Sequence, residues 1–155
     1  MNPARPSRKT LRTDARALIE TCAGWNSRLA SRHITLFLDR ELAGAGVTVA
    51  QLGLLAQIAA ASDDTLGALA KRTGLDQSTL SRNLRTLEGD GLVEIAVVKA
   101  DQRRRSVWLT ETGARRLEAA IPVWRKAHAK LAQRLPPELA RRLGEAAQAL
   151  GDDRA

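Results

Sequence analysis

The chain has 155 residues, 44% of them hydrophobic and 27% charged, which suits one domain, or one domain with dimerisation helices attached. It contains a single cysteine, so no disulfide can form within it, which fits a reducing cytoplasm. No segment approaches the roughly 20 apolar residues of a membrane span, and no apolar run of signal-peptide length follows the basic start. The sequence therefore predicts a cytoplasmic protein without a membrane partner.

The net charge of +8 is concentrated in three short segments. Residues 1–16 carry a net charge of +4, and residues 71–85 and 99–105 carry +3 each. Positive charge gathered in this way indicates a polyanionic partner such as nucleic acid. A charged run is often only a solvated surface, and for residues 1–16 taken alone that simpler interpretation is preferred.

In the N-terminal third, the sequence predicts a flexible basic arm over residues 1–13 and a dimerisation segment over residues 14–47. One long helix is expected from Asp14 to about Ala43, where glycines end it. Its apolar residues recur with a repeat of nearly seven residues. They are Leu18, Cys22, Trp25, Leu29 and Leu36, with His33 in the gap.

The central segment, residues 48–110, predicts three short helices followed by a hairpin. Thr48 and Gln51 form a capping box for the first helix. Single residues cap the other two helices, namely Thr65 and, after a turn at Gly74, Asp76. The apolar stretches 92–98 and 106–109 predict a hairpin with a long polar tip.

The third of these helices has two different faces. Leu80, Leu84 and Leu87 are spaced by four and three residues, so they form a buried stripe. The opposite face carries hydroxyl and guanidinium groups, which are suited to contacting base edges in a major groove. Its residues are Ser78, Ser81, Arg82 and Arg85.

The C-terminal segment, residues 111–155, predicts two more helices. Thr110 caps the first, in which Pro122 is expected to cause a kink or leave a carbonyl without a partner, and Pro137 begins the second. Both this segment and the N-terminal helix carry more apolar surface than one small domain can cover. Such a surplus of apolar surface indicates an interface between two copies of the chain. The alternative is that these helices pack on their own domain.

The order of elements and one motif resemble the MarR family of transcription regulators. The motif Asp101-x-Arg103, followed after five residues by Leu109-Thr110, is similar to that family's wing signature. Residues 75–82 resemble its recognition helix, and the resemblance extends over about residues 14–150. It implies a mainly α fold with a small β-hairpin wing, that is, a winged helix-turn-helix with N- and C-terminal dimerisation helices.

The resemblance also implies a function. The expected protein is a homodimer that binds a double-stranded DNA operator, acts as a repressor and is released by a small effector, without a cofactor or a metal. Arg103 would enter the minor groove, and Asp101 would hold Arg103 by an ion pair. If the strand continues, Arg104 and Arg105 point to alternate sides, so that one contacts phosphate.

Within the recognition helix, the hydroxyl groups near its N-terminus suit phosphate or base contacts, whereas the arginines suit guanine. The hydroxyls belong to Ser78, Thr79 and Ser81, and the arginines are Arg82 and Arg85. Bonding of Thr79 to the helix backbone is an equally good interpretation.

The effector expected from the resemblance is an aromatic acid bound between the dimer helices and the winged domain. Residues that are able to line its site are Trp25, Arg32, His33, Trp124 and His128. Packing is the simpler role for each of them. Some family members sense oxidants through a cysteine held by tyrosines; this chain has no tyrosine, so a buried inert thiol is favoured for Cys22.

An enzyme is the main rival class. The two histidines and one cysteine match no catalytic motif or metal-ligand spacing, so no catalytic residue is assigned. A winged-helix protein that binds RNA or protein, and a regulator that activates, remain alternatives. The sequence identifies neither the operator nor the effector.

Overall fold

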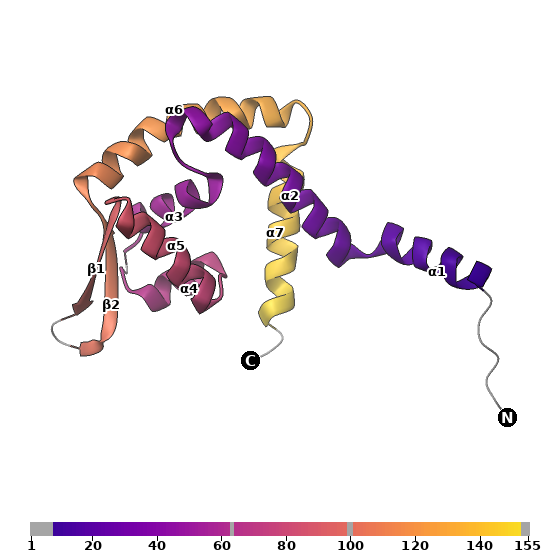
Figure 1. Cartoon of the computed structure of the whole chain (residues 1–155), viewed down its shortest axis with the longest axis horizontal. Coiled ribbons are helices and arrows are strands. Elements are labelled where there is room, and N and C mark those ends of the chain that lie inside the picture. Colours follow the sequence, from indigo (N-terminus) through magenta and orange to yellow (C-terminus); the bar gives the residue numbers. More distant parts are fainter. Residues whose placement is uncertain (1–7, 63, 99–100, 153–155) are drawn as a thin grey trace. The chain divides into compact units, whose positions relative to one another are not determined.

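The computed structural model describes residues 8–62, 64–98 and 101–152, and within them the side chains of residues 10–62, 64–97 and 105–150. The chain forms two compact units, Met1–Phe37 and Leu38–Ala155. The units meet inside one helix, and each is described by itself (Figure 1).

Unit 1 consists of helix α1, Arg8–Thr21, and the first part of α2, Ala23–Leu42. The prediction of one helix starting at Asp14 is wrong in two respects, because the helix starts earlier and is divided at Cys22. The arm predicted over residues 1–13 is also wrong for residues 8–13, which are helical, and residues 1–7 lie outside the described part. Residues 8–21 contain no proline or glycine, so nothing in them interrupts the helix.

Local hydrogen bonds explain the division at Cys22. The Thr21 hydroxyl donates to the Ala17 carbonyl at 2.7 Å, a bond that tends to bend helices. The Cys22 Sγ accepts from the Trp25 backbone N–H at 3.4 Å, as a side chain before the first turn of a new helix does. Gly24, in that first turn, further lowers the helix propensity.

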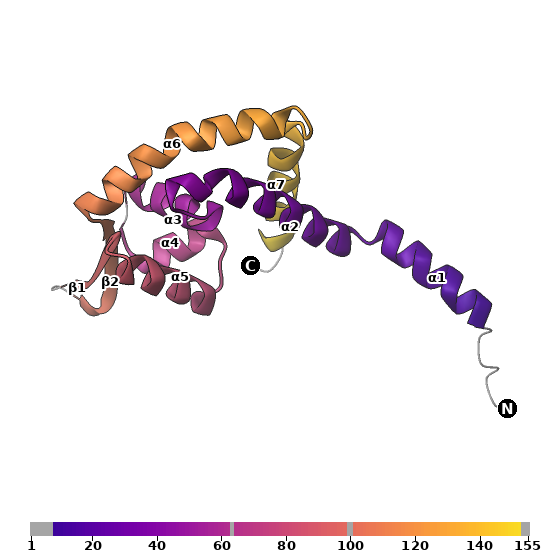
Figure 2. The same ribbon diagram turned by 45° about the horizontal axis from the view of Figure 1, so that its top comes forward.

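Unit 2 contains the end of α2 and eight further elements (Figures 1 and 2). They are the 3-10 turn η1 (Ala43–Ala45), α3 (Val49–Ala59), α4 (Leu66–Thr73), α5 (Gln77–Gly89), β1 (Val93–Val98), β2 (Asp101–Leu109), α6 (Glu111–Ala132) and α7 (Pro137–Asp152). This order of helices and hairpin is that of a winged helix, as predicted.

The predicted helix caps are confirmed. Thr48 and Gln51 form the capping box of α3, and Thr65, Asp76 and Thr110 each accept a hydrogen bond from the first turn of the helix that follows. Gly74 has a φ of 64°, a left-handed conformation that glycine adopts without strain between α4 and α5.

The core of unit 2 lies where α3, α4, α5, the hairpin and α6 meet. The predicted stripe of Leu80, Leu84 and Leu87 is buried in it, together with Leu52, Leu55, Ile58 and Leu69. Leu92, Val93 and Val107 add the inner face of the hairpin, and Leu117 and Ala120 add that of α6. The apolar period of α5 therefore identified its buried face correctly.

The hairpin differs from its prediction at the tip. The sequence predicts a long polar tip up to residue 105, but β2 begins at Asp101. The register slips between Val97 and Val98, which pair with Arg105 and Asp101 respectively. Residues 101–105 contain no glycine or proline, so their polarity does not prevent an exposed strand from continuing.

The base of the hairpin is anchored to the segment before α4. Thr65 and Ser106 form an isolated antiparallel bridge, and the Val107 N–H donates to the Asp64 carbonyl at 2.8 Å. The Ser106 hydroxyl is buried and donates to the Asp64 carboxylate at 3.1 Å. These bonds fix the direction in which the wing leaves the domain.

Polar contacts join α6 to the segment between α2 and α3. Arg116 donates to the Gly46 carbonyl at 2.9 Å, and Lys130 forms an ion pair with Glu41 at 2.6 Å. In the same segment the Asp39 carboxylate accepts from the Val49 N–H at 2.7 Å. These three contacts lie within unit 2 and connect the end of α2, the start of α3 and α6.

Helix α6 continues through Pro122, which has no N–H to donate to the Glu118 carbonyl. Helix α7 begins at Pro137, as predicted, and is exposed along its length, with Leu139, Leu143 and Leu150 more than half exposed.

Within the described part, no single helix is long and apolar enough to cross a membrane. Only the bent pair Ala23–Ala45 and Val49–Ala59, taken together, meets that criterion, and the second of these helices contributes buried core residues.

Candidate nucleic-acid interface

Helix α5 presents the face that the sequence predicts for base contacts. Its leucine stripe is buried, while Ser78, Ser81, Arg82 and Arg85 are exposed. Within the described residues, the guanidinium groups of Arg82 and Arg85 take part in no hydrogen bond or ion pair. Both groups can therefore contact a ligand without breaking an internal interaction.

The N-terminus of α5 is organised by Asp76. One carboxylate oxygen accepts from the Ser78 hydroxyl at 2.6 Å and from the Thr79 N–H at 2.9 Å, and the other accepts from the Thr79 hydroxyl at 2.7 Å. The side-chain bond from Ser78, followed by those from Thr79, holds the pKa of Asp76 well below its usual range.

This arrangement changes the expected role of two residues. A phosphate oxygen needs a donor, and the hydroxyl protons of Ser78 and Thr79 are used by Asp76. The hydroxyl of Ser81 is not held in this way. The sequence identified Asp76 as a cap but not its bonds to two hydroxyls, although the spacings of two and three residues are typical of such caps.

We expect Asp76→Ala to lower the melting temperature at neutral pH. Because the carboxylate has a lower pKa in the folded state, its stabilisation is complete above its unfolded pKa of about 3.9 and is lost as the pH falls further. The difference in melting temperature between wild type and variant should therefore be constant from pH 7 to about 5 and shrink towards pH 3. Thermal unfolding followed by circular dichroism measures it.

The matched control is Asp90→Ala, at the other end of the same helix. The Asp90 carboxylate is exposed and accepts no hydrogen bond within the described residues. An equal, pH-dependent loss in both variants would contradict the role of Asp76.

The adjoining helix and the wing add further positive charge. Lys71 and Arg72 of α4 and Arg105 of β2 are exposed. Asp101, Arg103 and Arg104 belong to β2 by their backbone, but their side chains lie outside the described part, as do Lys99 and Ala100 entirely. The proposed ion pair between Asp101 and Arg103 therefore stays a prediction.

The exposed face of the wing also contains a contact that sequence reasoning missed. Glu94 and Trp108 are paired across the hairpin, and the Trp108 indole N–H donates to the Glu94 carboxylate at 3.1 Å. Knowing the register would have revealed it, since residues opposite each other on a hairpin contact one another.

Comparison with known proteins decides the family. The model of the MarR family matches residues 45–104. The chain is 33% identical to the transcriptional regulator MosR of M. tuberculosis, in a crystal structure with DNA; the match covers 86% of this chain and 99% of that chain, with a TM-score of 0.78. The chain belongs to the MarR family.

Two further relatives match over shorter segments. The transcriptional regulator HosA of Escherichia coli O127:H6 is 39% identical over 67 residues, 36% of this chain and 50% of HosA. The phenylalanine–tRNA ligase alpha subunit of Pyrococcus horikoshii is 36% identical over 69 residues, 44% of this chain and 13% of the ligase subunit. The chain thus spans half or less of these two proteins. As a MarR-family protein it belongs with transcriptional regulators, which as a class are not enzymes.

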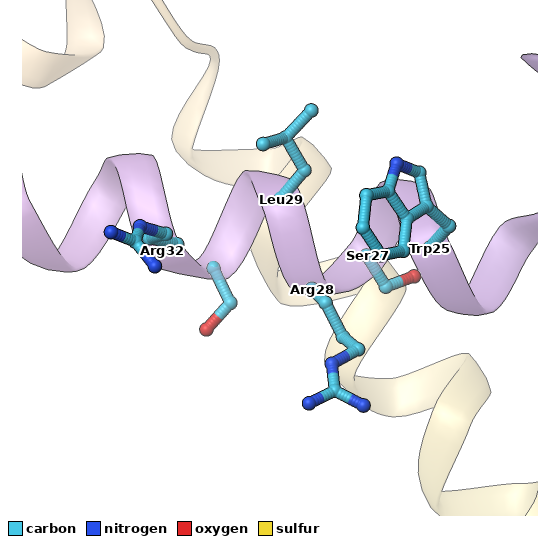
Figure 3. Close-up of a pocket in the computed structure, with 6 residues that line it drawn as sticks. Trp25, Ser27, Arg28, Leu29 and Arg32 are labelled. Carbon is cyan, nitrogen blue, oxygen red and sulfur yellow. The ribbon is translucent and has the colours of Figure 1, made fainter. Parts of the chain in front are cut away.

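Of the five expected effector residues of this MarR-family chain, three belong to unit 1 and two to unit 2. Trp25 and Arg32 line an open pocket of about 1000 Å³, and Figure 3 shows that the side chains labelled there all project from α2. Trp124 lines a different pocket, and the centroids of its ring and of the His128 ring are 4.4 Å apart. His33 is exposed and lines neither pocket.

The pocket at Trp124 is the better defined of the two for a small molecule. It has a volume of about 620 Å³ and lies within unit 2, between α3 and α6. Its walls are mainly apolar, and its polar members are Gln57 and Arg125. Sequence reasoning missed Arg125, which follows Trp124 directly and offers a cation beside an aromatic ring.

Cys22 is half-buried rather than buried, so the expectation of a fully buried thiol is wrong. The thiol is only partly covered because its neighbours in the apolar row, Leu18 and Trp25, are themselves 64% and 56% exposed. Among the described residues, no group of three histidine, cysteine, aspartate or glutamate side chains is placed to hold a metal ion.

Proposed function

We propose that this chain is a homodimeric transcriptional regulator that binds double-stranded DNA in a sequence-specific manner, represses transcription and is released by a small molecule. The exposed pair Arg82 and Arg85 on α5 is the observation that carries the proposal. The likeness to MosR, whose crystal structure contains DNA, supports it.

In the proposed complex, α5 enters the major groove. Arg82 and Arg85 contact base edges, where the two donors of a guanidinium group match the O6 and N7 acceptors of guanine. Ser81 and one of Arg104 and Arg105 contact phosphates. Arg103 enters the adjacent minor groove from the wing, directed by Asp101, and favours A·T-rich sequence because the narrow groove concentrates negative potential.

The dimer follows from the exposed leucines of α7, together with the apolar residues of the N-terminal helices. Two copies would present two α5 helices to successive major grooves. A pseudo-palindromic operator is then expected, with half-sites about 34–36 Å apart, one turn of DNA.

The decisive experiment is selection of bound fragments from the genomic DNA of the host, followed by competition in fluorescence anisotropy. The selected duplex should displace a labelled copy of itself far better than random duplex of equal length. Its affinity should fall with salt at a log–log slope of about −0.9 per phosphate contacted. Equal binding of both duplexes would contradict sequence-specific regulation.

RNA binding is the second candidate, because one of the similar proteins is a subunit of a tRNA ligase. Structured RNA of the same length belongs in the same competition. If RNA displaces the probe better than the selected duplex does, RNA is the partner.

For release, we propose that an aromatic carboxylate binds between α3 and α6. Trp124 supplies a stacking surface, and Arg125 supplies a charge for the carboxylate. Such a ligand weakens DNA binding only by its preference for the DNA-free form, with a typical coupling of about 1–3 kcal/mol. Salicylate is the probe, and its affinity should fall about 5- to 150-fold when the selected duplex is bound.

Tryptophan fluorescence follows this titration, with Trp25→Phe as the matched control for Trp124→Phe. Quenching should disappear in Trp124→Phe and remain in Trp25→Phe. Equal salicylate affinity with and without DNA would show that salicylate is not an effector. A reporter gene behind the selected operator distinguishes repression from activation, since loss of a repressor raises its expression.

A further inference from the structure

A groove between α4 and α5 adjoins the exposed face of α5. It has a volume of about 370 Å³ and lies within unit 2, where the two helices are neighbours (Figures 1 and 2). Its walls are mainly apolar, and the residues that line it are Leu66, Gly67, Ala70, Gln77, Leu80, Ser81 and Leu84. Ser81 belongs both to the groove and to the exposed face of α5, so the groove is continuous with the surface proposed to contact DNA.

Gln77 lines this groove from the first position of α5. Its side chain is exposed, and its carboxamide takes part in no hydrogen bond within the described residues. The carboxamide oxygen accepts hydrogen bonds and the nitrogen donates them. Both atoms of Gln77 are therefore available to a ligand that lies along α5.

The other polar side chains at this end of α5 are already engaged. The hydroxyls of Ser78 and Thr79 donate to the Asp76 carboxylate at 2.6 and 2.7 Å. The carboxylate holds these two hydroxyls without holding the carboxamide of Gln77. Among the described side chains in the first turn of α5, Gln77 is therefore the one that can donate to a ligand and accept from it at the same time.

A carboxamide is complementary to one base above the others. In the major groove adenine presents the N7 acceptor beside the N6 donor, and the amide of a glutamine matches both. Thymine, which pairs with adenine, presents a methyl group that apolar side chains contact. An A·T base pair thus offers one partner for the carboxamide and another for the apolar groove beside it.

The walls of the groove suit a methyl group. Leu66 and Ala70 of α4 and Leu84 of α5 supply apolar surface, and none of the described residues that line the groove is charged. Gly67, in the first turn of α4, has no side chain, and a Cβ atom added there would meet nothing within 4 Å. The edge of a base can therefore approach the groove on the side of Gly67.

The spacing along α5 also predicts where such a pair lies in the operator. Gln77 and Arg85 are eight residues apart, which corresponds to about 12 Å along the helix axis. Successive bases of one strand are about 3.4 Å apart along the axis of DNA. The base pair at Gln77 is then expected about two to four positions from the guanine at Arg85, so the two side chains contact different base pairs.

We propose that Gln77 and the groove between α4 and α5 recognise an A·T base pair at one end of each half-site. Adenine N6–H donates to the Gln77 Oε1, and the Gln77 Nε2–H donates to adenine N7. The groove receives the methyl group of a thymine in the same or the adjacent base pair. The inference rests on the DNA binding of the proposed function and adds to it the identity of one base pair.

The first test combines a variant with a base analogue. Each adenine of the selected duplex is replaced in turn by 7-deazaadenine, which still pairs with thymine but lacks the N7 acceptor. At one position in each half-site this replacement should weaken binding of the wild type about 2- to 12-fold, the contribution of one hydrogen bond. Gln77→Ala should bind the unmodified duplex about 5- to 150-fold more weakly than the wild type and should not respond to the analogue at that position.

Gln148→Ala is the matched control, because it removes an exposed carboxamide from α7. It should keep the wild-type affinity and the wild-type response to 7-deazaadenine. Fluorescence anisotropy measures all these affinities, and circular dichroism verifies that each variant is folded. If the wild type responds at no adenine, or if Gln77→Ala responds as the wild type does, Gln77 does not recognise adenine.

The second test addresses the groove. Each thymine is replaced in turn by deoxyuridine, which lacks only the methyl group. At or beside the sensitive adenine, one replacement should weaken binding of the wild type about 4-fold, the contribution of burying one methyl group. Gly67→Leu places a side chain in the groove and should abolish the difference between thymine and deoxyuridine. Gly89→Leu, at the other end of α5, also has room for its Cβ atom and should retain the difference.

The outcomes separate this inference from the proposed function. If no thymine at or beside the sensitive adenine responds to loss of its methyl group, or if Gly67→Leu still distinguishes the two bases, the groove does not bind the methyl group. If Gly67→Leu binds no duplex, Gly67→Ala replaces it and should reduce the difference. In each of these cases, preference of the wild type for the selected duplex over random duplex would leave the proposed function standing.

Discussion

Replacing Gly113 by alanine is expected to lower the free energy of unfolding by about 3 kcal/mol, the upper end of the usual range for overpacking a core. Gly113 is buried in the first turn of α6, where a Cβ atom would lie 1.9 Å from the Leu92 carbonyl oxygen and 2.8 Å from its carbon. Backbone atoms obstruct it, so no side-chain rotation relieves the clash. Helix propensity alone would predict a gain of about 1 kcal/mol, and the clash exceeds it.

The clash lies at the base of the wing. The Leu92 carbonyl accepts from the Thr110 N–H at 3.1 Å, and the Thr110 hydroxyl donates to the Gly91 carbonyl at 2.6 Å. Moving Leu92 to make room would break the junction between hairpin and α6. Urea unfolding at fixed chain concentration measures the decrease in stability.

Gly53→Ala is the matched control, since Gly53 lies inside α3 and its added Cβ would meet nothing within 4 Å. We expect this control to stabilise the protein slightly, by about 0.5–1 kcal/mol. Equal effects of the two substitutions would contradict the close approach at Leu92.

Replacing Arg82 or Arg85 by alanine is expected to weaken binding to the selected duplex by about 1–3 kcal/mol each, roughly 5- to 150-fold, because each substitution removes a bidentate pair of hydrogen bonds to a base. Binding to random duplex should change much less, because such hydrogen bonds form only on the correct sequence. Both side chains are exposed on α5, so truncating them leaves the core intact. Fluorescence anisotropy with both duplexes measures the two affinities.

Two further variants complete this comparison. Arg103→Ala, on the wing, should weaken binding to all duplexes and most strongly where the minor groove is A·T-rich. Arg115→Ala is the control, because the one side-chain contact of this exposed arginine in the described part of the chain is an ion pair with Glu111 on α6. If Arg82, Arg85 and Arg103 variants lose affinity equally on selected and random DNA, the division of roles between helix and wing is wrong.

The fold of unit 2 was predictable because its signals are local. A capping residue, a turn glycine and an apolar period each act within one or two turns of helix. Thr48, Asp76 and Gly74 identified element ends, and the leucines of α5 identified its buried face.

The features that the sequence did not predict depend on weaker or more distant interactions. The division at Cys22 arises from a hydroxyl bond of Thr21 and a thiol bond of Cys22, which compete with a helix that the apolar spacing still favours. The start of β2 at Asp101 depends on pairing with Val98, a choice that composition does not fix. The bonds of Ser78 and Thr79 to Asp76 required knowing the geometry of the cap.

The candidate effector site shows the same limit. Trp124 was expected to line an effector site, but the opposite wall of its pocket is formed by α3, which ends more than 60 positions earlier in the chain. Residues so far apart in sequence are brought together only by the packing of the two helices. Periodicity along α6 therefore could not identify the residues of α3 that line the same pocket.

The contacts of Arg116 with Gly46 and of Lys130 with Glu41 attach α6 to the rest of unit 2 at two points. One point lies near its first turn and the other near its last, on either side of Trp124. A ligand that widened the space between α3 and α6 would strain both attachments at once. A hydrogen bond contributes about 0.5–1.5 kcal/mol to stability. The free energy of the two contacts is therefore comparable to the coupling free energy that release from DNA requires.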